Sequence, residues 1–166
     1  MSTLKVDTIQ HSGGTTGLTI NSNGQLFQPN TPRFRVRLSS DQSIANASNV
    51  KLALATVDYN VGSYWDASNY KFTPPAGVYS LTLMVTINSS TPDYVLARIY
   101  KNGSIFVDGR AGESNAANMY VGTTATTNLY LDGSDYIEFY VQHNVGSSTN
   151  AESDVHNTYA CGFLIG

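Results

Sequence analysis

The side chains that most often carry enzyme chemistry are few in this sequence of 166 residues. The three histidines, His11, His143 and His156, fall in segments rich in Ser, Asn and Gly, so we expect solvated rings. A zinc site would need further ligands at a defined spacing, and Asp154 is the acid that lies near. The sequence therefore predicts no metal site and no cofactor.

The acidic residues form two pairs that deserve a chemical interpretation. Asp58 and Asp66 would suit a glycosidase if they faced each other across a sugar, but nothing in their spacing marks them out. Asp132 and Asp135 bracket the turn "DGSD", where we expect side-chain to backbone hydrogen bonds. The alternative, a calcium site, would need oxygen ligands from elsewhere.

Nucleophile motifs are also missing from the sequence. It contains no Gly-x-Ser-x-Gly elbow, phosphate loop or His-Glu-x-x-His pattern. Cys161 alternates with apolar core positions, which predicts a buried and inert thiol. We therefore expect a protein that is not an enzyme.

The overall composition excludes several partner classes. Charged residues make up 13% of the chain, the net charge is −3, and no basic block occurs, so nucleic acid is not expected as a partner. No run approaches the roughly 20 apolar residues of a membrane span, and no signal peptide is apparent. The single cysteine fits synthesis in a reducing compartment.

From Pro32 onward, apolar residues recur with a period of two, which is typical of strands. The longest such run is "VYSLTLMVTIN", which predicts a central strand with Tyr79, Leu81, Leu83, Val85 and Ile87 on its core face. Further strands are expected in "RFRVRL", "VKLALATV", "YVLARIY", "SIFVD", "TTNLYL", "YIEFYVQ" and "TYACGFLI". The pattern predicts an all-β antiparallel sandwich or jelly roll.

Three local features position these strands. Pro74 and Pro75 stop one strand before the longest one, and Gly77 is expected to take a backbone geometry closed to other residues. Gly103 in "KNG" predicts a hairpin turn with positive φ. The arginine row in "RFRVRL" (33, 35 and 37) is interpreted as charge that guards a strand against unwanted pairing.

The composition changes at Pro32, which predicts two segments: an arm over residues 1–31 and a sandwich domain over residues 32–166. The arm has two short apolar patches separated by Gly and Asn turns, too little to order thirty residues alone. It is either a floppy tail or an attachment arm that orders on a partner by strand addition. The residues expected to make that attachment are Leu4, Val6, Ile9, Leu18 and Ile20.

Residues 33–166 resemble the globular head of complement C1q and its tumour-necrosis-factor-like relatives. The first piece of the pattern is an Asn-x-Gly, an aromatic-Asp pair, a Phe, a Pro/Gly turn and Val-Tyr: Asn60, Gly62, Tyr64, Trp65, Asp66, Phe72, Pro75, Gly77, Val78 and Tyr79. "ARIYKNG", "LYLDGSDYIEFYV" and "CGFLIG" follow in the family order. The family has a structural Asp or Asn where Asp66 stands. Its Gly-Asp pair is split here by Ser134.

The resemblance implies a ten-stranded jelly roll that assembles as a compact homotrimer. In the family, the inner sheet faces neighbouring protomers, and Asn128 and Tyr130 point opposite Leu129 and Leu131 in the sequence pattern. The residues expected at the trimer interface are Tyr120, Asn128, Tyr130 and Tyr159. The alternative is that these are ordinary half-exposed sheet residues.

Two long polar loops, "GRAGESNAANM" and "HNVGSSTNAESDVHN", are candidate ligand surfaces for a sugar or a protein. Their candidate contact residues are Glu113, Asn115, Asn144, Asn150, Glu152 and Asp154. The alternative is that both loops are surface connections that are free to vary.

The arm "TLKVDTIQHSGGTTGLTINSNG" resembles N-terminal segments of virion proteins from tailed phages, particularly marine ones. That resemblance implies a surface appendage of the virion, synthesised in the host cytoplasm. It would be a capsid decoration or head fibre, or a short tail fibre with a receptor-binding tip, and its other partners would be virion proteins and a host surface glycan or protein. The alternative is a free-standing, lectin-like carbohydrate-binding module of a bacterium.

Overall fold

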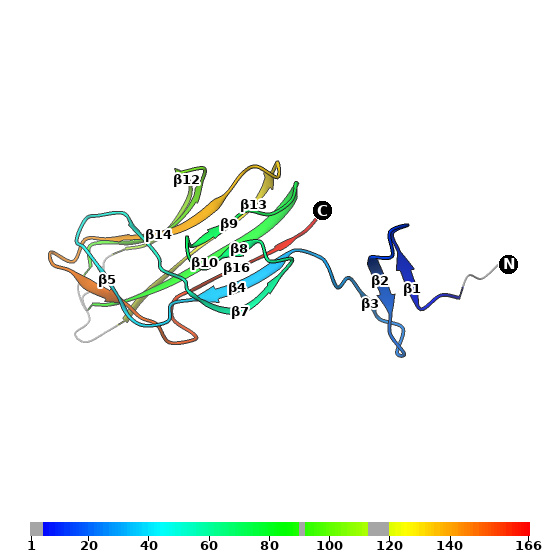
Figure 1. The fold of residues 1–166 in the computed structure, drawn as a ribbon. Helices are drawn as coiled ribbons and strands as arrows, with labels where there is room; N and C mark the ends of the chain where they lie inside the picture. Colours follow the sequence, from blue (N-terminus) through cyan, green and yellow to red (C-terminus); the bar gives the residue numbers. More distant parts are fainter. Residues whose placement is uncertain (1–4, 90–91, 113–119) are drawn as a thin grey trace.

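The computed structural model describes residues 5–89, 92–112 and 120–166, which form strands, turns and loops (Figure 1). One antiparallel sheet contains β4 (Arg33–Arg37), β5 (Gln42–Ile44), β7 (Thr56–Val61), β10 (Gly77–Asn88), β13 (Tyr120–Leu131), β15 (Thr149–Ala151) and β16 (Tyr159–Leu164). The other contains β6 (Val50–Lys51), β8 (Trp65–Asp66), β9 (Lys71–Phe72), β11 (Val95–Lys101), β12 (Ser104–Ala111) and β14 (Ile137–His143). The described residues include no helix that is long and apolar enough to cross a membrane.

Strand β10 is the centre of the first sheet. It pairs with β13 along its whole length, from Gly77 opposite Leu131 to Asn88 opposite Tyr120. On its other side it pairs with β16 and then with β15. Its five alternate residues from Tyr79 to Ile87 are fully buried, as the apolar alternation predicts.

The core lies between the two sheets and contains an aromatic cluster. The Phe34 ring from β4 lies 4.4 Å from the Phe72 ring and stacks on Trp65 at 5.5 Å. Phe139 from β14 completes the group at 6.2 Å from Phe34. Since Trp65 and Phe72 belong to the second sheet, these contacts join the two layers of the sandwich.

The Pro/Gly turn leads into β10 as expected, but the reason for a glycine at position 77 differs from the predicted one. The Tyr79 hydroxyl donates a hydrogen bond to the Pro75 carbonyl oxygen at 3.0 Å. Gly77 is not among the residues with positive φ. A Cβ there would lie 2.4 Å from Leu164 Cδ1 and 3.2 Å from the Gly166 carbonyl oxygen, so close approach of the C-terminal segment, and not φ, favours glycine. Gly103 does have positive φ, at 77°, as predicted.

The expected strand "VKLALATV" is interrupted between β6 and β7. The chain changes sheets here: β6 pairs with β14, whereas β7 pairs with β4. The Gln42 side chain accepts a hydrogen bond from the Ala53 amide and donates one to the Lys51 carbonyl oxygen, both at 2.8 Å. Leu52 and Leu54 remain buried, so the apolar alternation reflects the core and not a continuous strand.

The N-terminal arm forms a small antiparallel sheet of its own in the order β1 (Thr8–Gln10), β2 (Thr16–Ile20) and β3 (Leu26–Phe27). Tight turns close both hairpins, with Gly14 and Gly24 at φ values of 86° and 80°. Strands within the arm itself were not predicted from the sequence, and the attachment of the arm to a partner stays a prediction. Figure 1 shows this sheet outside the sandwich, near the end that holds the C-terminus.

Candidate self-association surface

The surface of the seven-stranded sheet that points away from the core is called here the outer face of this sheet. The pairing register places its residues in rows across β13, β10, β16 and β4. One row contains Asn128, Ser80, Phe163 and Arg33; the next contains Thr126, Thr82, Cys161 and Arg35; the third contains Thr124, Met84, Tyr159 and Arg37.

Large apolar and aromatic side chains lie exposed at the end of this face where β10 begins. Tyr130 is 60% exposed and lies opposite Val78, which is also exposed. Phe163 is 53% exposed, and Ile165 follows just beyond β16. A contiguous exposed apolar patch of this kind is typical of an interaction surface.

The middle of the outer face consists of small side chains whose polar groups are largely paired within the sheet. The Thr82 and Thr126 hydroxyl oxygens lie 3.4 Å apart, and the Thr124 hydroxyl donates to the Met84 sulfur at 3.1 Å. Cys161 lies between Thr82 and Arg35 and is half-buried, so the prediction of a buried thiol is wrong. Its pKa is raised chiefly by burial, so the thiol stays protonated and poorly nucleophilic.

Charged side chains cluster on the part of the outer face formed by β4 and β7. Arg35 and Arg37 both pair with Asp58, the second through Nε to Oδ1 at 3.1 Å, and the Arg35 guanidinium lies 4.6 Å from the Tyr159 ring centroid. β4 pairs with β16 and with β7, so it is no edge strand. The interpretation of the arginines as an edge guard is therefore wrong, because they belong to a charged cluster on a paired strand.

The four residues expected at a trimer interface, Tyr120, Asn128, Tyr130 and Tyr159, all lie on the outer face. Tyr120 and Tyr130 stand at opposite ends of β13 and are well exposed, and Asn128 is exposed between them. Tyr159 is half-buried against Arg35. The structure brings these residues onto one surface, while their contact with a neighbour stays a prediction.

A second apolar feature lies at the edge of the sandwich. β12 is the edge strand of the second sheet, and its Ile105 and Phe106 are about half exposed. Further along β12, Gly109 lies directly against the Thr124 backbone of β13. Sequence reasoning placed "SIFVD" in a strand but missed this edge, because alternation alone does not tell which strand of a sheet is outermost.

Comparison with solved structures finds the same architecture in several proteins. Murine APRIL superposes with a TM-score of 0.60 at 11% identity, covering 80% of this chain and 99% of that chain. The globular domain of zebrafish complement 1qA gives 0.60 at 13% identity (81% and 98%), and Eiger TNF from S. frugiperda gives 0.55 at 8% identity (82% and 92%). The fold is the tumour-necrosis-factor and C1q jelly roll. No family model and no curated protein matches the sequence.

The acidic pairs of this jelly roll have structural roles. Asp66 Oδ1 accepts hydrogen bonds from the Ser68 and Asn69 amides, and Asp58 is held by its two arginines. Asp132 Oδ1 accepts bonds from the Ser134 and Asp135 amides, which confirms the expected turn. The Asn69 side chain, which donates to Asp66 Oδ2 at 2.7 Å, is the main cause that lowers the pKa of Asp66, and the Ser68 and Asn69 amides lower it further. The Ser134 amide is the main cause that lowers the pKa of Asp132, so both carboxylates remain ionised acceptors within their turns.

The Asp135 carboxylate ties this turn to the β11–β12 hairpin. It accepts a hydrogen bond from Asn102 Nδ2 at 2.6 Å and pairs with Lys101 Nζ at 2.8 Å. These two partners, Lys101 first, lower the pKa of Asp135 to about 2.

His143 contradicts the expectation of solvated histidines, whereas His11 and His156 are exposed. β14 continues through His143, which pairs with Val95 and is fully buried. Its Nε2 lies 3.0 Å from the Ile44 carbonyl oxygen. The polar residues that follow His143 made the sequence look like a loop one residue too early. Among the described residues, no three potential His, Cys, Asp or Glu ligands group together as a metal site.

The second candidate ligand loop lies at the end of the sandwich opposite the arm, where Thr149 donates a hydrogen bond to the Asn88 carbonyl oxygen at the end of β10. The second loop is partly ordered as β15, which pairs with β5. Asn144 donates to Asp93, and Asn150 is exposed. Glu152 and Asp154 are half-buried and exposed, respectively. Glu113 and Asn115 lie outside the described residues.

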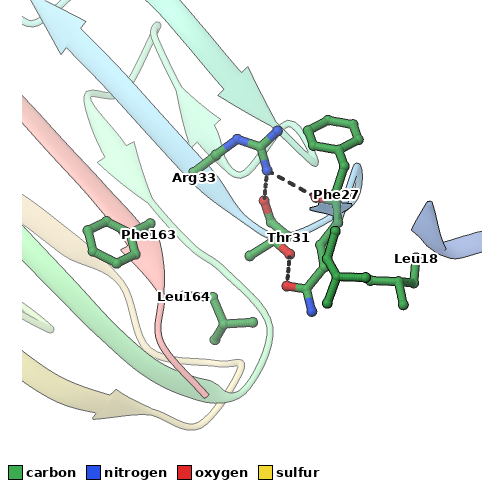
Figure 2. A pocket seen from close by; sticks show the side chains of 8 residues that line it. Leu18, Phe27, Thr31, Arg33, Phe163 and Leu164 are labelled. Carbon is green, nitrogen blue, oxygen red and sulfur yellow. Dashed lines mark hydrogen bonds between the residues drawn. The ribbon is translucent and has the colours of Figure 1, made fainter. Parts of the chain in front are cut away.

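The arm meets the sandwich at an apolar groove of about 450 Å³ (Figure 2). Its lining residues are Leu18, Leu26, Phe27, Gln28, Thr31, Arg33, Phe163 and Leu164. Of the predicted attachment residues, Leu18 lines this groove, Ile9 is exposed on β1, Val6 and Ile20 are half-buried, and Leu4 lies outside the described residues.

Proposed function

We propose that this protein is a non-enzymatic, homotrimeric jelly-roll head whose protomers pack through the outer face of the seven-stranded sheet. The observation that carries the proposal is the apolar end of that face, where Tyr130, Val78 and Phe163 lie exposed next to one another. Exposed aromatic side chains on a flat sheet surface are typical of an interface core. The shared fold with tumour-necrosis-factor-like and C1q-like domains supports the same arrangement.

A closed three-fold ring requires two different patches on each protomer, because each copy offers one surface to the next copy and a second surface to the previous one. The outer face is the first patch. The β12 edge with Ile105 and Phe106 is the second, since it presents two exposed apolar side chains at the side of the same sandwich. The trimer therefore packs the edge of one head against the outer face of the next.

The biological role that we propose is that of a virion surface appendage of a tailed phage, fixed to the particle by residues 1–31. The positions of the two ends support this role. The Leu164 amide donates to the Pro32 carbonyl oxygen at 2.9 Å, which places the arm at the start of β10. Thr149 donates to the Asn88 carbonyl oxygen at the far end of β10, so the second polar loop lies away from the arm.

Gold-labelled antibody against residues 32–166, applied to intact particles of the source phage, tests the role. Label over the capsid identifies a decoration protein or head fibre, and label at the tail tip identifies a short tail fibre that contacts the host. Particles without label contradict the virion role. The trimer proposal is tested separately, by the mass of the purified chain, so the two parts of the proposal can fail independently.

A second candidate is a free-standing lectin-like module, which the polar residues at the end opposite the arm favour. Asn150 is exposed there, and Asn144 lies in the same segment. This candidate predicts that the purified chain binds one glycan class on an array and that Asn150→Ala reduces that binding. Binding to no glycan above background contradicts it.

A further inference from the structure

The groove between the arm and the sandwich leaves apolar surface open to solvent. Leu26 is 68% exposed and Phe27 is 51% exposed on the arm side, and Phe163 is 53% exposed on the sandwich side. Such surface is costly to leave in water. Figure 2 shows Leu18 and Phe27 from the arm on one side of the groove and Phe163 and Leu164 on the other.

The junction itself is held in one conformation by Arg33. Its Nη1 donates hydrogen bonds to the carbonyl oxygens of Gln28 and Thr31, at 3.3 and 3.2 Å. Its guanidinium also lies 5.7 Å from the Phe27 ring centroid. These contacts connect the arm wall of the groove to β4 of the seven-stranded sheet.

The groove is continuous with the outer face of the seven-stranded sheet. Arg33 and Phe163 line the groove and are also cross-strand partners in the row that continues through Ser80 to Asn128. A copy of the chain that packs on the outer face at this row therefore reaches the mouth of the groove.

The position of each strand along the length of the sandwich determines which part of the second copy reaches the groove. Gly109 of β12 lies against Thr124 of β13, and the two strands run in opposite directions. A bulge lies between Val107 and Ile105 of β12, since Gly109 pairs with Ala97 and Ile105 with Tyr100, so Ile105 is three ladder positions back from Gly109. Ile105 is therefore level with Thr127, directly beside Asn128 of the row next to the groove. Lys101 Nζ donates to the Tyr130 carbonyl oxygen at 3.2 Å, which holds the start of this hairpin at the same end. Rotation about a three-fold axis along the strands preserves this level.

We propose that the groove is closed by a second copy of this chain, whose Ile105 and Phe106 pack against Leu26, Phe27 and Phe163. The inference rests on the self-association proposed above and adds that the arm is part of the interface. The arm would then stabilise the trimer in addition to attaching it to a particle. Residues of two protomers would together fill the groove.

Photo-cross-linking of the full chain tests this contact. Phe27→p-benzoylphenylalanine places a photoreactive ring in the groove, and Ile9→p-benzoylphenylalanine is the matched control, because Ile9 is equally exposed at 51% on the same arm but does not line the groove. Irradiation of the first variant should give a covalent product of twice the chain mass. Peptide mapping should place the link within residues 104–108. The control should give no such product.

The outcomes separate the two proposals. A trimeric chain whose position 27 links only within its own chain, or to a second copy outside residues 104–108, overturns this inference and leaves the trimer standing. A monomeric chain overturns both. A second variant, Leu26→Ser with Phe27→Ser, should raise the concentration at which the trimer dissociates about tenfold; an unchanged value also overturns the inference.

Discussion

Gly109 lies so close to β13 that a Cβ at this position would be 1.9 Å from the Thr124 carbonyl oxygen. The contact joins the edge of the second sheet to the edge of the first, because β12 and β13 belong to different layers. Since the obstacle is backbone and not a flexible side chain, β12 must move away when any side chain is added.

We expect Gly109→Ala to destabilise the fold by roughly 1–3 kcal/mol, the usual cost of overpacking a tight contact. Gly112→Ala is the matched control, because nothing lies within 4 Å of a Cβ at that position. It should change the free energy of unfolding by less than about 0.5 kcal/mol. Urea unfolding of both variants at one protein concentration measures the difference. Equal stabilities of the two variants would contradict the β12–β13 contact.

Acid should weaken the link between the β11–β12 hairpin and the "DGSD" turn. Lys101 and Asn102 hold the pKa of Asp135 at about 2, below the ordinary value of 3.8. A lowered pKa means that the carboxylate stabilises the fold above pH 3.8, and that this stabilisation is lost as the pH falls toward about 2. Asp135→Asn should therefore lower the thermal midpoint at pH 6 and have a smaller effect at pH 2.

Thermal unfolding of the wild type and Asp135→Asn between pH 2 and pH 6 measures this difference. Asp7→Asn, in the exposed part of the arm, serves as the control and should follow the wild type throughout. A difference in thermal midpoint between the wild type and Asp135→Asn that stays constant across the whole pH range would contradict the lowered pKa of Asp135.

Cys161 provides a natural probe of the outer face. In the single chain the thiol is half-buried between Thr82 and Arg35, so a maleimide can reach it, although its raised pKa makes the reaction slow. In a trimer packed through this face the thiol is covered. We expect labelling of the assembled protein to be at least tenfold slower than labelling after dilution to the dissociated state. Equal rates in both states would place the interface elsewhere.

The alternation of apolar and polar residues was enough to predict β10, its buried face and a sandwich or jelly roll. The full burial of Tyr79 through Ile87 follows from one local pattern, and the "KNG" hairpin follows from one glycine. Such features are local, because strand period and positive φ are properties of neighbouring residues. The C1q-like order of motifs then extended the prediction from strands to topology.

The interaction surfaces could not be predicted in the same way. Phe27 and Phe163 line one groove, and Gly109 lies against Thr124; in both cases the residues are far apart in the sequence. His143 was misjudged because its sequence neighbours are polar, while its burial comes from Val95 and Ile44. The hairpins of the arm were not predicted, because they depend on the turn glycines Gly14 and Gly24 more than on buried area.

The mass of the full chain in solution tests the central claim most directly. Light scattering of the wild type should give three times the chain mass of 17.9 kDa. Thr82→Lys puts an unpaired charge in the middle of the outer face and should give a monomer. The free energy needed to bury that charge exceeds the free energy gained by association. Ser40→Lys, in an exposed loop, should stay trimeric. A wild-type monomer, or a Thr82→Lys trimer as stable as the wild type, would contradict self-association through this face.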